Sequence, residues 1–188
     1  MGRRTQVFSY VVGNASVAQE LYTRTNQKIF YAGLALESWR KAEQAHNLNA
    51  LAVIQAERES ALFHLYGALL GLCHEIAGYY RLPGYDAPRA ESFLRPDVLE
   101  AAPSQELGEL VELAQSPESW LANLLRAYNQ MFRPPQPARE GKVDPAAALI
   151  SVVSLDEAEQ LLDHETLEMW RQQLKGLAQR FRQTLSEW

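Results

Sequence analysis

The stretch ALFHLYGALLGLCHEIAGYY, residues 61–80, decides the fold of this 188-residue chain. If it is helical, apolar side chains point in nearly every direction, and a helix of that kind is normally buried in a core. Its uninterrupted apolar run, from Leu65 to Cys73, is much shorter than the about 20 residues that cross a bilayer, which argues against a membrane span. The pattern extends from about Ala50 to Arg81, where Leu82-Pro83-Gly84 stops it. We therefore predict that residues 50–81 form a buried central helix.

Small residues mark one side of this predicted helix. Gly67 and Gly71 lie four positions apart, with Ser60 and Gly78 nearby. Such a stripe lets another helix approach closely. Tight packing inside the chain is the favoured interpretation, and contact between two copies is the alternative.

A long helix is predicted before the central one. Ser16-Val17-Ala18-Gln19 fits a capping box, and apolar residues then recur at helical spacing to about His46: Leu21, Ile29, Leu36 and Trp39. Asn47 and Asn49 bracket a short turn, so the two helices should pack antiparallel. Residues 1–15 are expected to be a loose N-terminal extension outside the domain.

The segment after the central helix is interrupted by prolines. Residues 82–103 contain four of them and are expected to hold one short helix near Asp97–Ala101. A third helix is predicted to begin at Ser104 and to break at Ser116-Pro117, since serine and proline are typical of a helix start. It continues to Phe132 and is followed by a polar, Pro-rich loop over residues 133–145.

A fourth helix is predicted from the capping box Ser154-Leu155-Asp156-Glu157, with a restart at Asp163 as the alternative. Residues 146–153 before it fit a short helix or a strand, and helix or irregular backbone is favoured because a lone strand would have no partner. The complete pattern predicts an all-α, four-helix-bundle-like single domain over residues 16–188, with long connections before the third and fourth helices.

Composition restricts the classes of function. A formal net charge of −5 argues against nucleic-acid binding, which usually needs a basic face. Cys73 is the only cysteine, so neither an internal disulfide nor a cysteine-based zinc motif can form. These features favour the reducing cytoplasm, with Cys73 as a buried, inert thiol.

Acidic and histidine motifs fall short of known metal sites. Glu106, Glu109 and Glu112 have the spacing of magnesium-binding carboxylates, but no second acidic set faces them, so a solvated face is favoured. Glu43-Gln44-Ala45-His46 is a single copy of a di-iron unit that requires two. His74-Glu75 begins like a zincin motif, yet Gly78 stands at the position of the second histidine. We therefore expect no metal and no cofactor.

Arg58 and His64 have the spacing of the Arg-x(4–6)-His pattern in HEPN-type helical ribonucleases. Arg40 and His46 repeat the same spacing, and about one such pair is expected by chance. A HEPN-like ribonuclease is therefore kept only as a further alternative.

Polar residues inside the predicted core define a candidate site. Antiparallel packing about a turn near residue 48 places Glu75 opposite Tyr22, close to Arg24, with His74 facing the same polar segment. A buried charge requires a partner, and Arg24 is the predicted partner of Glu75. The favoured interpretation is that these polar groups bond to one another within the fold, and a ligand pocket is the alternative. Tyr22, Arg24, His74 and Glu75 are the candidate ligand-binding residues.

Three stretches carry a resemblance: ELYTRTNQK at residues 20–28, FHLYGALLGLCHEIA at residues 63–77 and LSEW at residues 185–188. They resemble a family of small uncharacterised helical proteins from pseudomonad-type bacteria. The resemblance covers the chain from about residue 17 to its end. It implies a bacterial cytoplasmic protein and brings no assigned activity or catalytic residue.

Three hypotheses about function follow. The first is a non-enzymatic interaction or scaffold protein that forms a homodimer. It is suggested by the lack of a catalytic constellation, by the small-residue stripe, and by Trp188 and Tyr85 as candidate exposed aromatics. The second is a small-molecule- or metal-binding bundle with a polar pocket between the first two helices. The third is the ribonuclease. The expected partner is another protein or a second copy of this chain. Binding to a nucleic acid or to a membrane is not expected.

Overall fold

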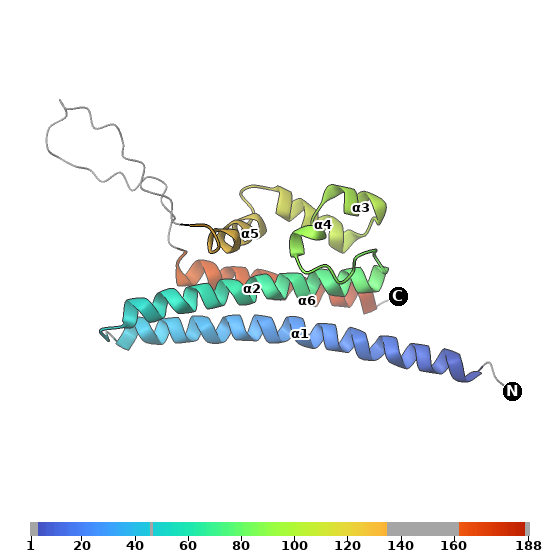
Figure 1. Ribbon diagram of the computed structural model, residues 1–188, viewed down its shortest axis with the longest axis horizontal. Helices are drawn as coiled ribbons and strands as arrows, with labels where there is room; N and C mark the ends of the chain where they lie inside the picture. Colours follow the sequence, from blue (N-terminus) through green and yellow to red (C-terminus); the bar gives the residue numbers. More distant parts are fainter. Residues whose placement is uncertain (1–3, 46, 135–161, 187–188) are drawn as a thin grey trace, which may run out of the picture.

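The computed structural model describes residues 4–45, 47–134 and 162–186 and confirms the all-α class (Figure 1). Three long helices run beside one another, and shorter helices cover one side of them. The helices are α1 (Arg4–Ala45), α2 (Ala50–Tyr80), η1 (Ala90–Ser92), α3 (Pro96–Ala101), α4 (Gln105–Gln115), α5 (Trp120–Gln130) and α6 (His164–Ser186).

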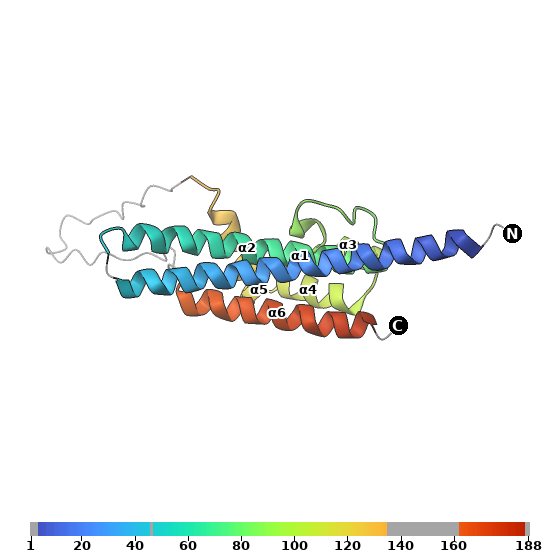
Figure 2. The same ribbon diagram turned by 90° about the horizontal axis from the view of Figure 1, so that it is seen from below.

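The helices α1 and α2 form an antiparallel hairpin through a turn at Leu48 and Asn49, as predicted. The Ser38 hydroxyl donates a hydrogen bond of 2.8 Å to Glu57 across the two helices, which places the turn centre near residue 48. The start of α1 was predicted wrongly, because the helix begins at Arg4 and not at Ser16. Its first turns extend beyond the ends of α2 and α6 (Figures 1 and 2).

The stripe of glycines on α2 faces α1. A Cβ atom at Gly71 would lie 2.6 Å from Thr25 Oγ1, and one at Gly67 would lie 3.3 Å from the Lys28 stem. The predicted tight packing inside the chain is therefore confirmed. Since α1 occupies the stripe, it no longer supports contact between two copies.

The central position of α2 is confirmed. It contacts α1, α6, α5, α4 and η1, and its residues from Ala61 to Ala77 supply much of the hydrophobic core. Of the helices that the structure describes, only α2 is long and apolar enough to cross a membrane, and 72% of the corresponding window is buried in the protein. The shorter α4 and α5 take the fourth position of the bundle-like arrangement (Figure 1).

Local capping explains where α5 and α6 begin. The Ser116 amide still bonds to Glu112 O as the end of α4, and Ser119 caps α5 by accepting from the Ala122 amide at 3.0 Å. The start predicted at Ser116 was therefore too early. The Asp163 carboxylate accepts from the Thr166 amide at 2.7 Å, which confirms the alternative start for α6. The predicted start at Ser154 lies outside the described residues, as do most of the 133–145 loop and all of 146–153.

Candidate functional site

Three helices bring a polar cluster together around Glu75 on α2. Its side chain is 1% exposed, and the Arg182 guanidinium of α6 donates two hydrogen bonds of 2.8 Å to its two oxygens. Arg182 also donates to Asn26 Oδ1 at 2.8 Å and lies 4.8 Å from the centre of the Tyr22 ring, both on α1. Burial and the nearby Glu75 carboxylate raise the pKa of Tyr22. The cluster thus joins α1, α2 and α6 through one arginine.

This geometry corrects the predicted partner of Glu75. Tyr22 lies beside Glu75 as expected, but Arg182 forms the ion pair, whereas Arg24 is exposed on α1. Helix periodicity explains the error: Arg24 is two positions after Tyr22, so it points about 200° away around the helix. A bidentate, well-packed pair of this kind satisfies the charge of Glu75 without a ligand.

His74 faces away from the Glu75 cluster. Its Nε2 donates a hydrogen bond of 2.8 Å to the Ala87 carbonyl, and its ring packs edge-on against Phe93 with the centroids 5.6 Å apart. Both partners belong to the connection after α2, so His74 anchors that connection. Of the four predicted site residues, the structure brings Tyr22 and Glu75 together and separates Arg24 and His74 from them.

A second polar cluster fixes the same connection to α5. Tyr66 donates a hydrogen bond of 2.8 Å to Glu91 and stacks on Tyr128 at 3.7 Å between centroids. Burial opposes the ionisation of Glu91, but hydrogen bonds from its own amide, Tyr66, Arg89 and Asn129 outweigh burial and lower its pKa. Burial, together with the bond to Glu91, raises the pKa of Tyr66 to about 12. The polar groups of this cluster therefore bond to one another, and they hold the connection after α2 in place against α5.

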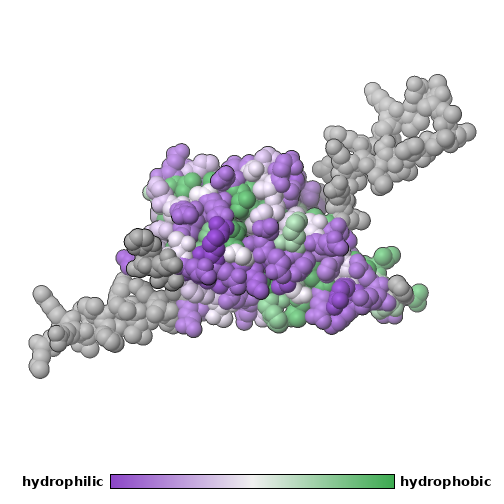
Figure 3. All heavy atoms as spheres, turned by 180° about the vertical axis from the view of Figure 1, so that it is seen from behind, coloured by the Kyte–Doolittle hydropathy of each residue, from purple (hydrophilic) through white to green (hydrophobic). Residues whose placement is uncertain are grey.

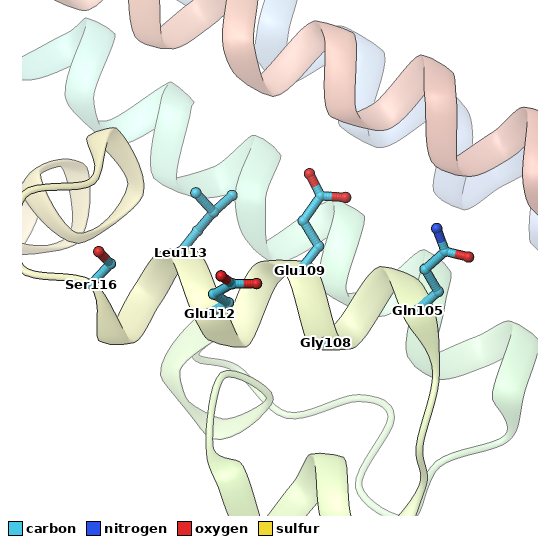
Figure 4. Close-up of a pocket in the computed structure, with 6 residues that line it drawn as sticks. All are labelled: Gln105, Gly108, Glu109, Glu112, Leu113 and Ser116. Carbon is cyan, nitrogen blue, oxygen red and sulfur yellow. The ribbon is translucent and has the colours of Figure 1, made fainter.

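The carboxylates of α4 have diverging roles. Glu106 is buried and accepts from Tyr80 at 2.9 Å, so the predicted solvated face is wrong at this position. Glu109 pairs with Arg180 of α6 at 2.6 Å, and Glu112 is exposed. A surface hollow of about 560 Å³ runs beside them, and Figure 4 shows Glu109 pointing from it toward α6.

The hollow has a one-sided lining. Its lining residues come from α4 and from Ser116, which follows directly after that helix: Gln105, Gly108, Glu109, Glu112, Leu113 and Ser116. Within the described ranges, no group of three or more His, Cys, Asp or Glu side chains has the geometry to hold a metal ion.

The residues of the ribonuclease pattern have separate surroundings. The Arg58 guanidinium lies 5.0 Å from the Trp39 ring centre and donates to Gln55. The His64 ring lies between Tyr31 and Phe63, with centroids 5.4 and 5.5 Å away. His64 Nδ1 is buried and has no hydrogen-bond partner in the described part of the chain. Burial, and then the Lys28 charge, lowers the pKa of His64.

Four exposed apolar side chains lie on α1 and α2 near this point, and we call them the aromatic patch: Phe30, Tyr31, Leu34 and Phe63. Their exposed fractions are 61%, 38%, 48% and 49%. Tyr31 and Phe63 contact the His64 ring, and Phe30 lies beside Tyr31. The Phe30 and Tyr31 rings are 6.2 Å apart, and Lys28 Nζ lies 5.2 Å from the Phe63 ring centre. The patch therefore crosses from α1 to α2. In Figure 3, hydrophobic side chains lie along the lower edge of the molecule, where α1 runs, and they interrupt a largely hydrophilic surface.

Sequence reasoning missed both Arg182 and the aromatic patch. Arg182 belongs to the basic end of α6, where the helix dipole already explains a positive charge. Phe30 and Leu34 did carry a signal, because they lie off the stripe formed by Ile29, Leu36 and Trp39. A large apolar residue outside the core stripe of an amphipathic helix has to find its own cover or remain exposed.

Residues 20–188 match the model of a family of unknown function (DUF6586). No curated protein and no solved structure matches the chain.

Proposed function

Since this chain belongs to the family of unknown function DUF6586, we propose from its geometry that it is a non-enzymatic helical interaction protein that forms a homodimer. The observation that carries the proposal is the aromatic patch. Three large side chains of α1 and one of α2 stand on a surface where water contacts them. Contiguous exposed apolar groups with a polar surround are typical of protein contact sites.

The interior polar groups support an interaction role over catalysis. Glu75 is paired with Arg182, Glu91 receives several hydrogen bonds, and His74 donates to a backbone carbonyl. A catalytic acid or base must offer a proton or a lone pair to a substrate in a cleft. These three groups already use their hydrogen bonds within the protein, where they hold the helices and the connection after α2 in place.

The proposed setting is the cytoplasm of a pseudomonad-type bacterium. The resemblance of residues 20–28 and 63–77 supports the source. Cys73 supports a reducing compartment, since it is the only cysteine and burial raises the pKa of its thiol to about 12. The net charge of −5 supports a protein partner rather than a nucleic acid.

Replacement of Leu34 by glutamate tests the proposal. Leu34→Glu places a charge in the aromatic patch, where association would desolvate it. We therefore expect the Kd of the dimer to rise by at least about 10-fold. Met169→Glu is the matched control, because Met169 lies on α6 with 50% exposure against 48% for Leu34. Sedimentation velocity and native mass spectrometry measure the dimer fraction, and circular dichroism verifies that both variants remain helical.

Two results would contradict the proposal. A wild-type chain that remains a monomer up to high micromolar concentration removes the homodimer. A dimer that Leu34→Glu and Met169→Glu weaken equally removes the aromatic patch as its interface.

A further inference from the structure

The exposed side of α1 carries two large apolar side chains, Phe30 and Leu34, in the middle of an otherwise polar face. Six exposed residues recur at alternating intervals of four and three: Thr23, Gln27, Phe30, Leu34, Glu37 and Lys41. Every face of an α-helix repeats in this way, and on this face the two central positions, Phe30 and Leu34, are apolar, as they are where two helices of a coiled coil meet. Within the described residues, the opposite side of α1 packs on α2 and α6, so this second seam faces outward.

Resting on the proposed homodimer, we infer that the α1 helices of two copies pack antiparallel along this seam, about a two-fold axis near residue 32. A two-fold interface is self-complementary, so each contact occurs twice. Phe30 then lies against the partner's Leu34, and Leu34 against the partner's Phe30. The two apolar positions of the seam cover each other, and Tyr31 and Phe63 flank them.

The two charged positions of the seam favour the antiparallel direction. Glu37 and Lys41 pair with each other on the same helix at 2.7 Å, and in this arrangement the uncharged Gln27 and Thr23 of the partner lie opposite them. A parallel pair in register would instead place Glu37 beside the partner's Glu37 and Lys41 beside the partner's Lys41. Like charges in direct opposition are unfavourable, and they discriminate strongly between competing arrangements.

Engineered cysteines test the direction in the full-length chain. Two cysteines at positions 27 and 37 of one helix are about 15 Å apart, and a disulfide requires Cα atoms within about 7 Å. The link between these positions can therefore form only between copies. Cys73 is 1% exposed and does not compete.

The variants are Gln27→Cys, Glu37→Cys and the double variant Gln27→Cys/Glu37→Cys, each oxidised under native conditions and analysed by non-reducing electrophoresis. We expect a covalent dimer from the double variant and from an equimolar mixture of the two single variants, and at most a trace from either single variant alone. Dimers from the single variants alone would show a parallel pair and overturn the inference. A double variant that is dimeric by sedimentation but does not cross-link would also overturn it and leave the proposed homodimer intact. A wild-type chain that stays monomeric would instead remove the proposed function and the inference together.

Discussion

Glu75 shows how one residue determines the packing around it. A carboxylate with a 1% exposed side chain has lost nearly all of its hydration, and Arg182 replaces that water with two charge-assisted hydrogen bonds. Because the same guanidinium also bonds to Asn26 and covers Tyr22, the pair fixes the position of α6 against both other long helices.

Loss of Arg182 is expected to be costly. Arg182→Met leaves the Glu75 carboxylate buried without a partner, which should lower the free energy of unfolding by about 3–5 kcal/mol. Arg24→Met, at an exposed arginine, should change it by no more than about 0.5 kcal/mol. Urea denaturation measures both values. The double variant Glu75→Gln/Arg182→Met should recover part of the loss because the unpaired charge is gone, and equal losses in the two single arginine variants would rule out the pairing.

At the scale of the helices, the contact between α1 and α2 depends on the absence of side chains at two positions. Gly71 lets the Thr25 backbone and hydroxyl lie directly against α2, and Gly67 leaves room for the stem of Lys28. Thr25 is fully buried and its hydroxyl bonds to Leu21 O at 3.3 Å, so it has no free space into which to move. Close-packed interiors of this kind resist added volume.

Gly71→Ala should therefore destabilise the protein by about 1–3 kcal/mol, since the new methyl group would overlap with Thr25. Gly176→Ala is the matched control within α6, where an added Cβ meets no atom within 4 Å. There the better helix propensity of alanine should stabilise the protein by about 0.5–1 kcal/mol. Thermal or urea unfolding measures whether each substitution raises or lowers the stability. A neutral Gly71→Ala would show that the contact between α1 and α2 is looser than the structure indicates.

Sequence periodicity was enough to predict most of the helices, but it could not predict which side chains pair between them. The apolar run at 61–80, the turn at Asn47 and Asn49, and the short helix near Asp97–Ala101 depend on local rules, and the structure agrees with them. The pairing of Glu75 depends on how α6 sits against the hairpin, which no local pattern encodes. The start of α1 was missed because a good capping box at Ser16 does not prevent a helix from continuing upstream.

Across the whole molecule, α2 is the element on which the other helices converge. Cys73 lies in its second half with 1% exposure, and α2 packs against η1, α4, α5, α1 and α6. Reagents can reach this thiol only when these helices separate. Its reactivity therefore reports on the opening of the complete fold.

Labelling of Cys73 by a thiol reagent should be at least about 10³-fold slower in the native protein than in urea, since opening must occur first. Leu51→Cys supplies an internal control, because position 51 is 83% exposed and should react at nearly the rate of an unfolded chain. Mass spectrometry then resolves one fast and one slow site. Rapid reaction of Cys73 while the circular dichroism spectrum stays native would mean that α2 opens locally.

The bond between Glu75 and Arg182 also has a consequence for biosynthesis, because it joins residues 107 positions apart. Ribosomes deliver α1 and α2 first, so the hairpin emerges with a carboxylate that has no counter-charge. In the hairpin alone the Glu75 carboxylate faces the water that Arg182 later replaces, because both of its hydrogen bonds come from α6. Burying the carboxylate without that partner would be costly, so the burial of Glu75 has to wait until α6 packs on the hairpin.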